Sequence, residues 1–289
     1  MKKLNIICNW NVSILPEDME ENTIYLDGSC KGYSHNAEFN AVSFDHHSGC
    51  NRFTTYATCV QVMHAVLMGL DVSSFNDVVI DDIDADTVLS IWLLQNPEKA
   101  ESKEVQDAVN QIGLVDAHFS NAFPIHPLHS NITRPYKDQN TKELLDGYLS
   151  LASKYFDGEY EPVVQEPRLG TFMGITNDGS FLVENTTFSE MYDSFDLVLG
   201  FSNMGKAGSG EDTFMYTLGK KSDFVQGDFS QIFEKLAVKE SETTVFPEFL
   251  TKNWGGGSSI GGSARYADQS CSRLRVDVVL KVIREVVFG

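Results

Sequence analysis

Two short strand-like runs, each followed directly by acidic or histidine side chains, constrain the fold of this chain more than any other feature. Residues 40–44 are predicted to form a buried strand, and Asp45-His46-His47 follow it. Residues 78–80 are predicted to form another, and the acidic run Asp82-Ile83-Asp84-Ala85-Asp86 comes just after it. In α/β folds, sites gather at the carboxyl ends of strands. The two runs therefore predict an α/β protein with a functional site at one edge of its sheet.

The first half of the chain alternates strands with helices. Strands are predicted at residues 4–8, 23–26, 40–44 and 77–81. Apolar residues at helical spacing predict helices at 54–70, 87–95, 103–112 and 140–156. This alternation favours a mostly parallel, Rossmann-like sheet that is covered on both faces.

The pattern changes after residues 157–166, a proline-containing segment that we interpret as a linker. We expect a metal-binding domain at residues 1–158 and a smaller α/β domain at residues 167–289. In the second domain, Asn177-Asp178-Gly179 predicts a hairpin turn, and valines and isoleucines over residues 278–287 predict an amphipathic terminal helix.

The charge and cysteine content narrow the function classes. The chain has 41 acidic and 22 basic residues and a net charge of −19, which disfavours a broad surface for duplex nucleic acid. A small phosphorylated substrate, or the end of a short single-stranded nucleic acid, is still compatible with this charge. Five cysteines without a CxxC pair favour a reducing, cytoplasmic setting, and no run reaches transmembrane length, so no membrane partner is expected. Assembly into a homo-oligomer is compatible with the sequence.

The side chains in the two runs are of the types that bind divalent metals. The alternative is that Asp45 and Asp84 cap helices and that His46 and His47 form an exposed turn. Carboxylates clustered without a partner repel one another and resist burial, and a cation removes that cost. The metal interpretation is therefore favoured.

A glycine-rich run lies near the C-terminus, at residues 253–265. Its glycines would let backbone N–H groups approach an anion, and serines and nearby arginines would add donors. The alternative is a flexible loop before a helix, with the arginines on a solvated face. The residues that we expect to bind substrate are Gly256, Gly257, Ser258, Ser259, Arg265 and Arg273.

These motifs resemble those of the DHH phosphoesterase superfamily. Asp45-His46-His47 is the tripeptide that names it, and residues 82–90 resemble the aspartate motif of its RecJ-like nucleases. The glycine-rich run is similar in kind and position to the signature of the associated DHHA1 domain, which closes over substrate. The order of the first two motifs is reversed here, and Thr87 stands where RecJ-like members usually have glycine. A permuted or divergent relative, or a convergent metal site, would explain this.

The resemblance implies a hydrolase with two divalent ions, Mn²⁺ or Mg²⁺, and a water that attacks phosphorus. It implies metal ligands at Asp45, His46, Asp82, Asp84, Asp86 and Asp116. Asp84 and His47 are the expected catalytic residues, with His47 beside the metal or facing substrate. His118, Asp27 and His35 are weaker ligand candidates, and a helix-end aspartate and a surface histidine are the alternative at residues 116 and 118.

Three function classes follow from these observations. The first is a metal-dependent phosphoesterase or phosphohydrolase acting on a nucleotide, an oligonucleotide or a polyphosphate. The second is a catalytically inactive sensor of the same fold that binds a nucleotide or another phosphorylated ligand. The third is a metallohydrolase that acts on a different bond. No HExxH or paired CxxC motif is present, and no GxGxxG follows the first strand, so zinc protease and dinucleotide-binding functions have no support.

Overall fold

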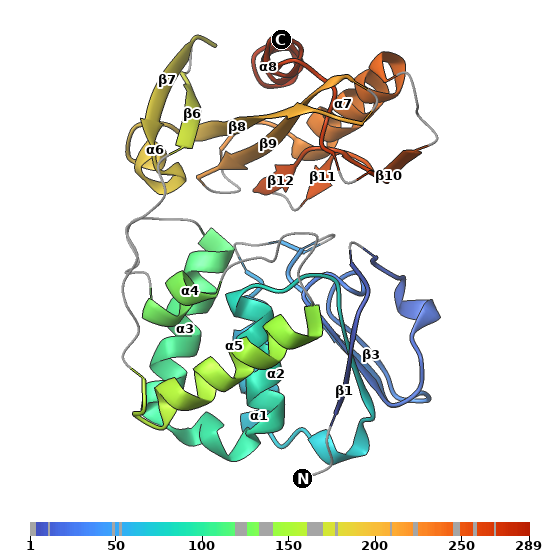
Figure 1. Cartoon of the computed structure of the whole chain (residues 1–289), viewed down its shortest axis with the longest axis vertical. Coiled ribbons are helices and arrows are strands. Elements are labelled where there is room, and N and C mark those ends of the chain that lie inside the picture. The colour runs from blue at the N-terminus through green and yellow to red at the C-terminus, as the bar shows by residue number, and fades with distance from the viewer. Residues whose placement is uncertain are drawn as a thin grey trace. The chain divides into compact units, whose positions relative to one another are not determined.

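The chain divides into two compact units in a computed structural model (Figure 1). Unit 1 contains the described residues up to Tyr160, and unit 2 contains those from Gly170 onward. The residues that the structure describes are 4–10, 12–47, 50–51, 54–118, 126–132, 141–160, 170–176, 179–208, 210–221, 225–244, 249–256, 259–268 and 270–289. Most of the expected linker lies outside these ranges.

Unit 1 is built on a five-stranded sheet. Its strands are β1 (Asn5–Cys8), β2 (Thr23–Leu26), β3 (Ser34–Asn36), β4 (Ala41–Phe44) and β5 (Asp77–Ile80). The strand order is β1-β5-β2-β4-β3. Strands β1, β5, β2 and β4 run parallel, whereas β3 pairs antiparallel with β4 at the edge. The expected α/β class is confirmed, with a sheet that mixes parallel and antiparallel pairs.

The helices of unit 1 pack against one face of this sheet. They are α1 (Thr58–Leu67), α2 (Ala85–Gln95), α3 (Lys103–His118), α4 (Pro127–Asn131) and α5 (Thr141–Phe156), with short 3₁₀ turns at Pro16–Asp18, Val72–Ser74 and Pro97–Glu101. Alternate strand residues such as Ile24, Phe44 and Ile80 join the helices in one large core. Helix α2 is buried from Ala85 to Leu94, which makes it the central helix of the unit.

The opposite face of the sheet has a different cover. Tyr25, Ala41 and Val79 point to this side and pack with Met19 and Cys30 in a smaller core. Among the described residues, no α-helix contributes to that core. The helical cover on both faces that the alternation predicted is thus not observed in the described residues, since the segments between β1 and β4 form turns and the 3₁₀ turn at Pro16–Asp18 and no α-helix. A Rossmann-like arrangement is not confirmed.

Helix α3 is longer than the sequence pattern predicted. The predicted end of this helix at residue 112 was wrong, because the helix continues to His118. Val105, Val109, Ile112 and Val115 recur at helical spacing and are buried, so the same face carries on into the last turns. Gly113 lies where a Cβ would be 2.6 Å from Val60 Cγ2. This glycine therefore lets α3 approach α1 closely.

Unit 2 contains an antiparallel sheet. Its strands are β6 (Gly170–Ile175), β7 (Phe181–Thr186), β8 (Leu197–Lys206), β9 (Asp212–Lys220), β11 (Gly255–Gly256) and β12 (Ile260–Gly262), in the order β11-β12-β9-β8-β6-β7. β10 (Leu250–Lys252) pairs separately with β13 (Arg265–Tyr266). β6 and β7 pair antiparallel, as the turn signal predicted, although Asn177 and Asp178 themselves lie outside the described residues.

The described residues of unit 2 also form the helices α6 (Phe188–Ser194), α7 (Phe229–Thr243) and α8 (Val276–Val287). The predicted terminal helix is observed as α8, which buries Val279, Val282 and Ile283. Ile232 and Leu236 of α7 belong to the same core as these residues and the sheet. The second unit is therefore a mixed α and β structure around its own core.

The glycine-rich run forms part of this sheet. Gly255 and Gly256 of β11 pair antiparallel with Gly262 and Gly261 of β12. A Cβ on Gly256 would lie 2.3 Å from the Gly261 Cα, and one on Gly261 would lie 2.2 Å from the Phe233 ring. Glycine is therefore needed at positions 256 and 261, because two strands and a helix approach one another closely there.

Alanine at Gly256 is expected to destabilise unit 2 by about 1–3 kcal/mol, because the added methyl would meet backbone atoms that have no room to move. Gly255 is the matched control, since a Cβ there would meet no heavy atom within 4 Å. Urea denaturation of the two alanine variants compares them directly. An equal loss of stability in both variants would contradict the packing explanation.

Candidate metal centre

Three neighbouring strands bring the site residues together. β2 lies between β5 and β4, and all three run parallel. Asp27 directly follows β2, the Asp45-His46-His47 tripeptide follows β4, and the acidic run at residues 82–86 comes after β5. Asp27 has a φ of 54°, a left-handed conformation that aspartate tolerates better than most residues. The carboxyl ends of the strands therefore present these side chains at one sheet edge.

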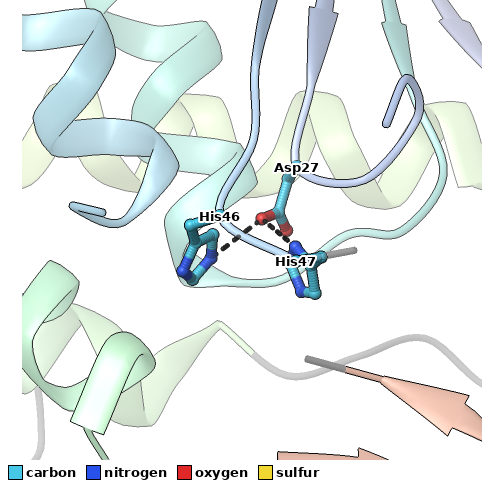
Figure 2. A group of neighbouring side chains, drawn as sticks. All are labelled: Asp27, His46 and His47. Atoms are coloured by element: carbon cyan, nitrogen blue, oxygen red, sulfur yellow. Dashed lines mark ion pairs between the residues drawn. The ribbon is translucent and has the colours of Figure 1, made fainter. Parts of the chain in front are cut away.

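Asp27 lies between the two histidines of the tripeptide. Its Oδ1 is 3.3 Å from His46 Nε2 and 3.4 Å from His47 Nδ1 (Figure 2). The side chains of His46 and Asp27 are almost completely buried, whereas that of His47 is 32% exposed. These three residues form a group whose ligand atoms lie within 4.8 Å of one another, which is close enough to hold a metal ion.

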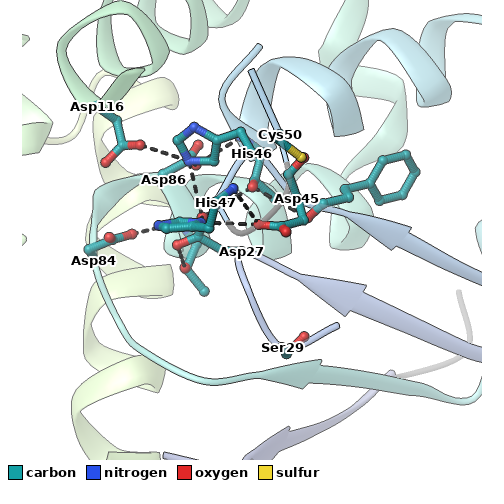
Figure 3. A network of polar contacts seen from close by, with 12 residues as sticks. Asp27, Ser29, Asp45, His46, His47, Cys50, Asp84, Asp86 and Asp116 are labelled. Carbon is teal, nitrogen blue, oxygen red and sulfur yellow. Dashed lines mark hydrogen bonds and ion pairs between the residues drawn. The ribbon is translucent and has the colours of Figure 1, made fainter. Parts of the chain in front are cut away.

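A second group shares His46 with the first. His46 Nε2 is 2.9 Å from Asp116 Oδ2 and 3.5 Å from Asp86 Oδ2. Asp86 is buried in the first turn of α2, and Asp116 lies in the last turn of α3. Figure 3 shows the carboxylates of both aspartates near the His46 ring. The structure therefore has two buried Asp/His groups that could hold metal, and His46 belongs to both.

The backbone holds Asp86 in place. Helix α1 begins with Thr58, and the N–H groups of Thr58 and Cys59 donate to Asp86 Oδ2 and Oδ1 at 2.9 and 2.7 Å. The hydroxyls of Thr58 and Thr87 lie 3.2 and 3.0 Å from Oδ1 and Oδ2 of Asp27. Both carboxylates are therefore fixed by donors from the first turns of α1 and α2.

The buried charges shift the pKa values of the two aspartates in opposite directions. Burial, together with the negative charges of Asp27 and Asp116, raises the pKa of Asp86 to about 7. Burial alone would also raise the pKa of Asp27, but the positive charge of His47 and the contact with His46 outweigh it and lower the pKa. A carboxylate cluster that retains a proton near neutral pH is one that a divalent cation would stabilise.

Asp45 orients His47. The carboxylate of Asp45 is fully buried and accepts hydrogen bonds from the N–H groups of Gly32 and His47, at 2.7 and 2.8 Å. Its Oδ1 also lies 3.1 Å from His47 Nδ1. The structure places Asp45 outside both groups, beside them, so its role as a metal ligand stays a prediction.

Asp82 and Asp84 also lie outside the two groups. Asp84 is the N-cap of α2, and its Oδ1 accepts the Thr87 N–H at 2.9 Å, which is the capping role that the sequence left open. Its carboxylate lies beside the His47 ring in Figure 3. Asp82 accepts the N–H of Ile83 at 2.7 Å. Metal binding by Asp82 and a metal or catalytic role for Asp84 stay predictions.

The structure places the weaker ligand candidates differently with respect to the two groups. Asp27 is at the centre of the site, although its sequence context is only a short strand and a glycine. His35 is exposed on β3 and belongs to neither group. Asp116 is in the second group, whereas the side chain of His118 lies outside the described residues.

Only some of the predicted substrate-binding residues lie within the described part of the chain. Gly257 and Ser258 lie outside the described residues. Gly256 is in β11, the Ser259 carbonyl accepts the Lys220 N–H at 2.8 Å, and Arg265 donates to Ser263 Oγ at 3.1 Å.

Arg273 has a largely buried side chain within unit 2. It donates to Glu211 and to the Cys271 carbonyl, and its guanidinium lies 4.3 Å from the centre of the Tyr266 ring. These contacts give Arg273 a structural function in the unit, and binding of substrate by these residues stays a prediction.

Comparison of the chain with protein-family models, with curated proteins and with solved structures gives no match. Within the described residues, no helix has both the length and the apolar composition needed to cross a bilayer. The functional argument therefore depends on the geometry of the Asp/His site.

Proposed function

We propose that the chain is a divalent-metal-dependent phosphoesterase or phosphohydrolase related to the DHH phosphoesterase superfamily. The observation that carries the proposal is the pair of buried Asp/His groups that share His46. Asp45-His46-His47 supplies both histidines of the site, which is the contribution that the resemblance implies. The proposal includes a Rossmann-like unit 1, supported by four parallel strands, three of which end at the site.

The donor set fits a divalent metal. Two imidazoles with carboxylate oxygens suit Mn²⁺, and Mg²⁺ is the alternative because it prefers oxygen ligands and retains water. The raised pKa of Asp86 shows how strongly this buried cluster disfavours another negative charge, and a cation would relieve that repulsion. Asp27, His46, Asp86 and Asp116 would hold the metal, with His47 at the exposed side.

The chemistry divides between the metal and His47. The cation would supply a Lewis acid for a phosphoryl oxygen and for the water that attacks phosphorus. Asp45 holds the His47 ring through Nδ1, and the partly exposed ring is positioned to contact substrate or to move a proton. Asp27 Oδ1 stabilises a positive charge on His47.

We propose a small phosphorylated substrate, namely a nucleotide, a short oligonucleotide or a polyphosphate, in a cytoplasmic setting. The net charge of −19 supports this, since a long duplex would meet repulsion away from the metal. Gly256, Ser259 and Arg265 of unit 2 are the described residues that we propose for substrate binding.

Hydrolysis of bis-p-nitrophenyl phosphate tests the proposal. Protein stripped with chelator should be inactive, and added Mn²⁺ should restore turnover. Changing His47 to glutamine should lower kcat by about 10²–10⁴-fold while metal stays bound at the second group, because a group that moves a proton contributes that much. His64→Gln, at an exposed histidine of α1, is the matched control and should be fully active.

A protein that binds Mn²⁺ but leaves this diester, nucleotides, dinucleotides and polyphosphate intact would contradict the hydrolase proposal. Ligand binding without turnover would then identify a sensor. Release of product from a substrate panel without phosphorus would identify a metallohydrolase of another kind.

A further inference from the structure

The threonine that begins α1 contacts both groups of candidate ligands. Thr58 is fully buried, its N–H donates to Asp86 Oδ2 at 2.9 Å, and its hydroxyl lies 3.2 Å from Asp27 Oδ1. Asp27 belongs to the first group and Asp86 to the second. Thr58 is thus hydrogen-bonded to a carboxylate of each group.

The start of α1 explains why a carboxylate is bound there. The N-cap residue is Ala57, which makes no side-chain cap hydrogen bond. The first N–H groups of a helix need acceptors from elsewhere, and the helix dipole favours a negative one. Asp86 supplies both oxygens, to the N–H groups of Thr58 and Cys59. A side chain of α2 therefore replaces the missing cap of α1 and is fixed in position.

The hydroxyl of Thr58 acts on the other carboxylate. Oδ1 of Asp27 is the oxygen that faces both histidines, and the Thr58 hydroxyl adds a donor to this same oxygen. The Thr87 hydroxyl donates to the opposite oxygen, Oδ2, at 3.0 Å. Rotation of the Asp27 carboxylate would break these contacts. The two hydroxyls therefore fix the orientation of the Asp27 carboxylate toward the histidines.

We propose that Thr58 is a positioning residue of the metal centre, which orients Asp27 Oδ1 through its hydroxyl and holds Asp86 through its N–H. This inference rests on the proposed function, because it requires that the two groups bind a divalent cation. Hydrogen-bond partners of metal ligands set their orientation, and losing one typically lowers metal affinity about 10–100-fold. Loss of the Thr58 hydroxyl should therefore weaken metal binding while every candidate ligand is still present.

Titration calorimetry with Mn²⁺ tests this inference on the full chain. Thr58→Val keeps the shape and the backbone N–H but removes the hydroxyl, and its affinity should fall about 10–100-fold. Thr58→Ser keeps the hydroxyl and should bind Mn²⁺ like the wild type. Thr58→Ala, which adds no methyl beside the carboxylates, replaces the valine variant if valine lowers the melting temperature.

Thr23→Val is the matched control. Thr23 is buried at the opposite end of β2 and donates its hydroxyl to the Glu21 carbonyl at 3.0 Å, away from the site. Its variant should retain wild-type affinity. Wild-type affinity in both hydroxyl-free Thr58 variants would overturn the inference and leave the metal centre standing, as would an equal loss in the Thr23 variant. Absence of Mn²⁺ binding in the wild type would overturn both proposals.

Discussion

Replacement of His46 by alanine is expected to abolish Mn²⁺ binding at both ligand groups, and hydrolysis with it. Nε2 of His46 lies within 3.5 Å of carboxylate oxygens from Asp27, Asp86 and Asp116. The substitution removes a ligand from both groups and leaves these three carboxylates facing one another. The loss of affinity should exceed the ~10–100-fold that is typical of an outer hydrogen-bond partner. Equilibrium dialysis against Mn²⁺ measures it.

Two further variants make this result specific. Asp116→Asn changes only the second group, so it should weaken metal binding there and leave the first group with its ligands. His35→Ala, at an exposed histidine on β3 of the same unit, should bind metal like the wild type. Wild-type stoichiometry and affinity in the His46 variant would contradict a shared ligand.

Replacement of Glu240 by glutamine is expected to give a large loss of stability in unit 2. Glu240 of α7 is completely buried, and its carboxylate is the acceptor for four donors. These are Trp254 Nε1 at 2.9 Å, Tyr266 OH at 2.8 Å, Ser272 Oγ at 2.5 Å and the Arg273 N–H at 2.6 Å.

Glutamine presents a donor in place of one acceptor oxygen, so two of these donors would lose their partner. Each buried donor without an acceptor costs about 1–3 kcal/mol, and the expected total is ~2–5 kcal/mol. Trp254 contacts the carboxylate directly, so its fluorescence during urea denaturation reports on this network. The matched control is Glu242→Gln on the same helix, where the exposed pair with Lys239 contributes little. Equal denaturation midpoints for both variants would contradict the proposed role of Glu240.

The α/β class, and the position of these Asp and His side chains at the carboxyl ends of neighbouring strands, follow from the sequence. Short apolar runs that end in Asp or His, separated by helical patterns, are sufficient to predict strands whose carboxyl ends meet. Asp27 received less weight because its central position depends on strand order. β2 lies between β4 and β5 only in the folded sheet, and nothing local at Asp27-Gly28 specifies this.

The local sequence pattern also could not distinguish the roles of Asp84 and Asp86 within the acidic run. Asp84 and Asp86 have similar neighbours, yet Asp84 caps its own helix and Asp86 binds the start of another. A clue was present at Ala57, since a helix whose N-cap is alanine needs an acceptor from elsewhere. Tertiary contact decided between them.

The glycine-rich run was expected to be an anion-binding loop, whereas part of it forms a pair of strands. Glycines permit both an anion-binding loop and a close strand pair, and the sequence favours neither strongly. The narrow spacing between Gly256 and Gly261, and the Phe233 ring against the latter, depend on how α7 packs on the sheet. Arg273 was likewise expected to face an anion, but its partners Glu211 and Cys271 come together only in the fold.

Metal content of the purified wild-type protein tests the central claim most directly. Samples would be reconstituted with Mn²⁺, Mg²⁺ or Zn²⁺, freed of excess ion and analysed by mass spectrometry. The two groups that share His46 predict about one to two Mn²⁺ ions per chain, two being the number that the resemblance implies. Protein that retains none of the three metals after reconstitution would contradict the account, and the Asp/His site would then be a metal-free ion-pair network.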